Sequence, residues 1–142
     1  MNKKNVQLTT YMGLIPFYAP LIYFFIKEND SNNSFIIQIP LIYGAVIASF
    51  ISGMQWEKLI SNQYKNSYVA ILPLVIAWSH FFVSSIFIST FLLILALFTN
   101  LFIDLTLLSK VLDHWFKKMR IIVTVLVSIS LIINFLSIFS VT

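Results

Sequence analysis

The sequence predicts an all-α membrane protein, a bundle of five transmembrane helices with its N-terminus inside and its C-terminus outside. Three observations predict this fold. First, 59% of the 142 residues are hydrophobic and only 10% are charged, whereas soluble domains carry about 25% charged residues. Second, the apolar residues form stretches close to the roughly 20 residues that one helix needs to cross a bilayer. Third, lysine and arginine gather on one side of the expected topology.

The apolar stretches leave no segment between them that is long enough to fold separately, so we expect one transmembrane domain over residues 1–142. The spans are expected at about residues 8–26, 35–56, 68–83, 86–108 and 120–139. Pro16 and Pro20 should kink the first span, which a bundle tolerates when neighbouring helices satisfy the freed carbonyls. The polar turn Lys27–Ser34 then separates the first span from the second.

The second span carries two rows of small residues at four-residue spacing, and we expect the other helices to pack against it. Small residues let helix backbones approach closely in lipid, where burial from water does not drive association. The two rows are Gly44, Ala48, Ser52 and Ala45, Ser49, Gly53. The span should end in a polar exit at Gln55, with Trp56 as an aromatic anchor at the interface.

The third and fourth spans are expected to form a tight hairpin. Tyr68–Leu108 is almost free of titratable groups and would be about 60 Å long as one helix, twice the thickness of a bilayer core. We therefore place a turn near Ser84–Ser85. Because the third span is the shortest and contains Pro73, a re-entrant or strongly tilted segment is an alternative. A polar, basic segment, Ser109–Arg120, precedes the last span.

The orientation follows from the lysine and arginine count, since basic loops stay on the cytoplasmic side. With five spans, one side holds eight basic residues and the other side holds only Lys27. The eight are Lys3, Lys4, Lys58, Lys65, Lys110, Lys117, Lys118 and Arg120. This asymmetry predicts the N-in, C-out topology and supports the count of five spans.

A candidate polar cluster lies at the inner end of the bundle and consists of Gln55, Trp56, Asp104 and Arg120. A carboxylate at the bilayer centre costs about 2.5–3.5 kcal/mol, and less near the interface. Asp104 should therefore pair with Arg120 or Lys110. One interpretation is a carboxylate that binds an ion or substrate; the simpler one is an ion pair that closes the hairpin of the last two spans.

Residue types that carry chemistry elsewhere are sparse. The sequence contains no cysteine, no phosphate-binding glycine loop and no metalloprotease or hydrolase motif. His80 and His114 fall on opposite sides of the expected topology and so cannot share a metal. We therefore expect no catalytic residue, no cofactor, no metal and no nucleic-acid partner. The expected partners are the lipid bilayer and either other membrane subunits or further copies of the chain.

Three stretches give the chain a resemblance to a known family. YGAVIASFISGMQW (43–56), LPLVIAW (72–78) and WFKKMR followed by Thr124 agree in order and spacing with patterns of the domain of unknown function 3429 family. That family includes transmembrane protein 69-like proteins. Asp104 falls where the family tends to carry an aspartate. The chain departs from the pattern at Gln55, where the family usually has histidine. The resemblance implies a multi-span inner-membrane protein and supplies no activity.

These observations lead to two hypotheses about function. The first is a non-enzymatic accessory, assembly or structural component of a membrane complex, because ionisable groups are nearly absent from long apolar spans. The second is a small oligomeric transporter or channel with a polar site at the cytoplasmic end. Eight of the nine basic residues are lysine and no arginine-rich transit segment is present. The bacterial inner membrane is therefore expected in preference to the mitochondrial inner membrane.

Overall fold

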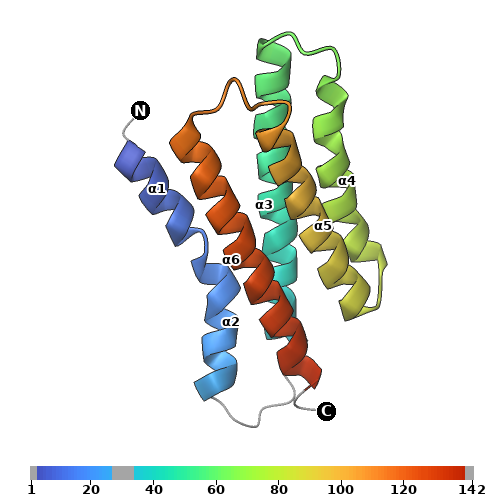
Figure 1. Ribbon diagram of the computed structural model, residues 1–142. Helices are drawn as coiled ribbons and strands as arrows, with labels where there is room; N and C mark the ends of the chain where they lie inside the picture. The colour runs from blue at the N-terminus through green and yellow to red at the C-terminus, as the bar shows by residue number, and fades with distance from the viewer. Residues whose placement is uncertain (1–2, 27–33, 140–142) are drawn as a thin grey trace.

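The computed structural model describes residues 3–26 and 34–139, and every regular element within them is helical. The helices run up and down alongside one another in a bundle (Figure 1). In chain order they are α1 (Lys3–Met12), α2 (Ile15–Ile26), α3 (Ser34–Ser61), the 3₁₀ turn η1 (Ser67–Ala70), α4 (Ile71–Ser79), the 3₁₀ turn η2 (His80–Phe82), α5 (Ile86–Leu105) and α6 (His114–Phe139). The all-α prediction is confirmed for the described residues. The polar turn expected at Lys27–Ser34 lies outside them except for Ser34.

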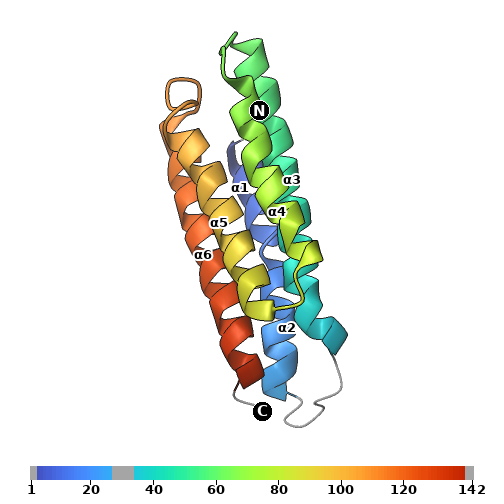
Figure 2. The same cartoon turned by 90° about the vertical axis from the view of Figure 1, so that its right-hand side faces the viewer.

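Helix α3 is the element with the most neighbours, because it packs against α2, η1, α4, α5 and α6. Helices α4 and α5 pack closely together on one side of it, and α2 with α6 on the other (Figures 1 and 2). The middle of the bundle is filled by apolar side chains from these helices, with Phe17, Ala48, Leu93 and Leu131 at most 1% exposed. The small-residue helix therefore lies where the sequence predicted it.

The two ends of the bundle differ in charge. One end, here called the basic end, holds the start of α1, the loop 62–66 and the loop 106–113 (Figure 1). Eight of the nine basic residues, all except Lys27, belong to these segments or to the adjoining helix turns. The turn 83–85 and the last turn of α6 lie at the opposite end. The alternation of ends thus agrees with the hairpins that the sequence predicted, and Lys27 lies outside the described residues.

Three helices are long and apolar enough to cross a membrane: Gln38–Ser61, Ile86–Leu105 and His114–Ser137. Ser67–Phe82 is a shorter apolar segment that runs against α3 and α5 and includes 3₁₀ turns at both of its ends. The predicted first span is divided between α1 and α2. Three candidate spans are therefore present by length and composition among the described residues.

The first predicted span consists of two helices, because a turn at residues 13–14 interrupts it just before Pro16. Pro16 lies in the first turn of α2, where its missing N–H costs no intrahelical bond. It therefore starts a helix instead of kinking one. Pro20 is inside α2 and deprives the carbonyl four residues earlier of its donor.

A contact between α2 and α6 serves the backbone next to this proline. The Phe17 carbonyl accepts a hydrogen bond from Ser130 Oγ at 2.8 Å and a longer one from Asn134 Nδ2 at 3.4 Å. Tyr18 returns a bond in the other direction, from its hydroxyl to the Leu126 carbonyl at 2.9 Å. These bonds join α6 to α2 at the Phe17 carbonyl, whereas the carbonyl that Pro20 leaves without its helical donor is that of Pro16.

Two helices extend further than predicted at the basic end. Helix α3 continues past Gln55 to Ser61, and Gln63 with a φ of 56° then ends it. Tyr64 N donates to Leu59 O and Gln63 N to Ile60 O, the bond pair of a Schellman motif. Helix α6 begins at His114, within the segment expected to be a loop. Both extensions bring apolar side chains into a second buried cluster, which includes Leu59, Ile103, Leu108 and Leu112 with Phe116 beside them.

Candidate functional site

The small residues of α3 divide between its buried and exposed faces. Gly44, Ala45, Ala48 and Ser52 are buried, Ser49 is half-buried and Gly53 is exposed. A Cβ atom at Gly44 would lie 3.5 Å from the Phe17 ring and 3.6 Å from Leu93, whereas one at Gly53 would meet nothing within 4 Å. Close packing within the chain therefore uses the Gly44, Ala48, Ser52 row and Ala45, and Gly53 faces outward.

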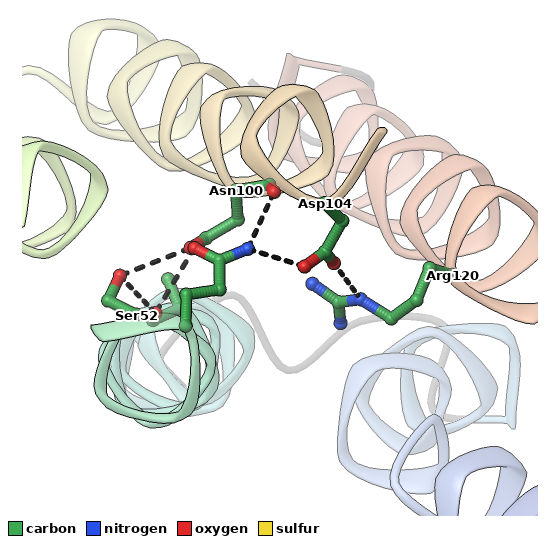
Figure 3. A network of polar contacts seen from close by, with 6 residues as sticks. Ser52, Asn100, Asp104 and Arg120 are labelled. Carbon is green, nitrogen blue, oxygen red and sulfur yellow. Dashed lines mark hydrogen bonds and ion pairs between the residues drawn. The ribbon is translucent and has the colours of Figure 1, made fainter. Parts of the chain in front are cut away.

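Asn100 joins α5 to this row of small residues and has no exposed surface. Its Oδ1 accepts a bond from Ser52 Oγ at 3.1 Å, and its Nδ2 donates to the Ala48 carbonyl at 3.2 Å (Figure 3). Only a small residue at position 48 leaves that carbonyl open to a side chain from the next helix. Asn100 is not among the predicted cluster residues, although its place one turn before Asp104 puts both on the same face of α5.

Asp104 lies at the centre of the polar network and is 4% exposed. Its Oδ2 accepts a bond from Arg120 Nε at 2.7 Å and its Oδ1 a bond from Gln55 Nε2 at 2.9 Å (Figure 3). The Gln55 amide donates a second bond, at 2.7 Å, to the Asn100 carbonyl. One carboxylate therefore holds α3, α5 and α6 together through a cation and an amide.

The structure brings together three of the four predicted cluster residues and separates the fourth. Gln55, Asp104 and Arg120 are buried and in contact, whereas Trp56 is 48% exposed and points away from them. Trp56 is the next residue on α3, and successive helix positions do not share a face. The partner of Asp104 is Arg120, and Lys110 is exposed in the loop that follows α5.

A small open pocket, with a cavity volume of about 10 Å³, adjoins the Asp104–Arg120 ion pair. It is lined by residues of α3, α5 and α6, namely Ile51, Met54, Gln55, Lys58, Asp104, Phe116 and Arg120. Lys58 reaches over it, with Nζ 5.2 Å from the centre of the Phe116 ring, a distance at which a cation is attracted to the ring face. The pocket is therefore apolar on its walls and positively charged at its rim.

The histidines lie away from this network. His80 is buried at the other end of the bundle, where Nδ1 lies 2.6 Å from the Ala77 carbonyl. His114 is exposed at the start of α6. Within residues 3–26 and 34–139, no group of three histidine, aspartate or glutamate side chains is placed to hold a metal ion.

The chemistry available to the network is that of charge pairing. The Asp104 carboxylate is matched by a guanidinium and an amide, and the described residues around it include neither a histidine nor a hydroxyl within hydrogen-bond distance of it. Gln55 Oε1 is buried without a partner among the described residues, which leaves one acceptor free. The geometry of the whole network suits the fixing of helix register more than proton transfer. Proton transfer needs an acid or base in contact with its substrate.

Comparison with known proteins bears on the whole of this architecture. The model of a family described as "Protein of unknown function (DUF3429)" matches residues 2–136. The chain belongs to the DUF3429 family. The matched region includes every residue of the Asp104 network, so the predicted family resemblance is confirmed, while the likeness to transmembrane protein 69 stays a prediction. No solved structure matches the chain. Membership of DUF3429 brings no activity with it, and function has to be argued from the site.

Proposed function

We propose that this DUF3429 protein is an integral membrane protein whose residues 1–142 form one domain of five spans, N-in and C-out. Three long apolar helices support it directly. Ser67–Phe82 and the α1–α2 pair fill the two other places in the bundle. The bacterial inner membrane fits the gathering of lysines at the basic end, because cytoplasmic loops carry the excess of basic residues.

Labelling of single cysteines tests this topology cleanly, because the natural sequence contains none. Asn66 and Ser84 are both exposed, at opposite ends of the bundle. We expect a membrane-impermeant maleimide applied to intact bacterial spheroplasts to label Ser84→Cys and to leave Asn66→Cys unlabelled. Lysed membranes, the control, should label both. The reverse pattern would contradict the orientation, and equal labelling in spheroplasts would contradict the number of spans.

We infer that the protein acts as an accessory, assembly or structural component of a membrane complex. The observation that supports this inference is that the buried polar residues of the network bond mainly to one another. Asp104 is matched by Arg120 and Gln55, and Asn100 by Ser52 and the Ala48 backbone. The middle of the bundle beyond them is filled by the apolar core. Transporters, in contrast, place substrate sites near the bilayer midplane on broken helices.

The outward face of α5 offers a surface for such a partner. It carries a stripe of large apolar side chains at helical spacing, four of them phenylalanine, each 41–66% exposed: Phe87, Phe91, Leu95, Phe98 and Phe102. Residues spaced by three and four positions line one helix face. We define these five residues as the α5 stripe and propose that a transmembrane helix of a partner subunit packs on it.

Extraction from native membranes in mild detergent, followed by mass spectrometry of the co-migrating proteins, tests the accessory role. We expect a defined, stoichiometric partner set, and we expect Phe91→Ala/Phe98→Ala to reduce its recovery several-fold. Ile129→Ala/Ile132→Ala is the matched control, because it trims two equally exposed side chains of α6. An extract that reproducibly contains no partner would count against the proposal, as would equal losses in the two variants.

The alternative function, a small oligomeric transporter or channel, is favoured by the pocket beside Asp104 at the basic end. Its site would consist of Gln55, Asp104 and Arg120, with Trp56 on the outer face. Recovery of only a small homo-oligomer in the extraction experiment would favour this function. Under it, Asp104→Asn should abolish uptake of the substrate.

A further inference from the structure

Arg120 is only partly used by the ion pair with Asp104. Its side chain is 8% exposed, and its Nε alone bonds the carboxylate. Within the described part of the chain, no acceptor is recorded for Nη1 or Nη2. Figure 3 shows the guanidinium on the side of the Asp104 carboxylate that is remote from α5. A guanidinium presents its donors in a planar fork that suits an oxyanion, so a buried fork is left open toward the pocket.

Lys58 brings a second cation to the same pocket. Its Nζ lies over the Phe116 ring, and among residues 3–26 and 34–139 no carboxylate pairs with it. The ionisable groups that line the pocket are thus two cations, Lys58 and Arg120, and one carboxylate, Asp104. The lining residues therefore carry a formal net charge of +1, and this charge favours the binding of an anion. Two kinds of donor line the pocket, the guanidinium of Arg120 and the ammonium of Lys58.

The apolar part of the lining indicates where such an anion would come from. Ile51, Met54 and Phe116 form the walls next to the cations, and none of the lining residues belongs to α1 or α2. A phosphate with hydrocarbon attached would satisfy the cations and the walls together, whereas a free phosphate would leave the walls exposed to water.

We propose that the phosphate of an anionic phospholipid binds at the open mouth of this pocket, with Arg120 Nη1 and Nη2 and Lys58 Nζ as its donors. Ile51, Met54 and Phe116 contact the first carbons of the lipid. The proposal rests on the membrane location put forward above, which places the basic end of the bundle at the depth of the headgroups. Arg120 then binds both the Asp104 carboxylate and the lipid phosphate. The bound lipid is thereby linked, through Arg120 and Asp104, to the contact between α3, α5 and α6.

Lipid titration of the purified full-length protein in detergent, read by native mass spectrometry, tests the proposal. The probes are dioleoylphosphatidylglycerol, dioleoylphosphatidylcholine and inorganic phosphate. We expect phosphatidylglycerol to bind about tenfold more tightly than phosphatidylcholine. Lys58→Gln should weaken that binding about tenfold, the usual effect of one charge-assisted hydrogen bond. Lys118→Gln is the matched control, because it removes the same charge from an exposed position of α6.

Arg120→Lys provides a second variant that keeps a cation beside Asp104 but removes the fork. We expect it to retain the folded bundle and to lose the preference for phosphatidylglycerol. Equal binding of the two lipids, or equal losses in Lys58→Gln and Lys118→Gln, would overturn the site. Binding of inorganic phosphate without a lipid preference would overturn the lipid as its source. Since the assay needs neither a partner protein nor an oriented membrane, its failure is distinguishable from failure of the proposed function.

Discussion

Replacing Arg120 with alanine is expected to lower the free energy of unfolding by about 3–5 kcal/mol, the usual effect of removing one partner of a buried ion pair. Asp104 would keep its Gln55 amide bond but lose its counter-charge at a position that is 4% exposed. An unpaired carboxylate is expensive both in a protein interior and in lipid. Reversible unfolding in mixed detergent micelles, monitored by circular dichroism, measures the loss.

Two further variants make this result specific. Lys118→Ala removes a neighbouring exposed cation and should change stability by less than about 0.5 kcal/mol. Arg120→Met combined with Asp104→Asn removes both charges together and should recover most of the stability lost in Arg120→Ala, because no buried charge is then left unpaired. If the double variant is as unstable as Arg120→Ala, the loss comes from packing and not from the ion pair.

Truncating Phe17 to alanine is expected to cost about 3–5 kcal/mol, the range for large buried aromatic side chains. Phe17 is 1% exposed, with its ring 5.1 Å from that of Tyr43 and close to the open Cα of Gly44. Its removal leaves a cavity where α2 meets α3, because α3 has no side chain at Gly44 to fill it. The same unfolding assay measures the effect.

Phe98→Ala is the matched control for Phe17→Ala. Phe98 is 46% exposed on the outward face of α5, and in detergent its removal should cost less than about 0.5 kcal/mol. A similar loss in both variants would mean that the α2–α3 contact is no more important to the bundle than its outer surface. A small loss in both would mean that α2 repacks around the missing ring.

Much of the site could be predicted because membrane helices obey strong constraints. A carboxylate inside an apolar span needs a partner, and the hairpin of the last two helices brings Arg120 to the depth of Asp104. That requirement predicts that Asp104 pairs with a cation. It does not decide between Arg120 and Lys110, and the structure does. The start of α6 decided it, since the helix begins at His114 and turns Arg120 inward.

The remaining errors concern properties that hydropathy does not report. Polarity suggested an end to α3 near Gln55, but the following residues are good helix formers and Leu59 is fully buried among apolar side chains. Adjacency in the sequence places Trp56 with Gln55, although neighbours on a helix face different directions. Asn100 escaped notice because a neutral amide perturbs hydropathy little, and its role depends on the exposed carbonyl of a small residue on another helix.

The bond from Ser130 to the Phe17 carbonyl joins residues 113 positions apart, and this has a consequence for the order of synthesis. At about 5–20 residues per second, the ribosome adds Ser130 roughly 6–23 s after Phe17. The bonds that join α6 to the Phe17 carbonyl therefore form only when the chain is nearly complete. A product that stops before α6 would lack this link between the first and last helices.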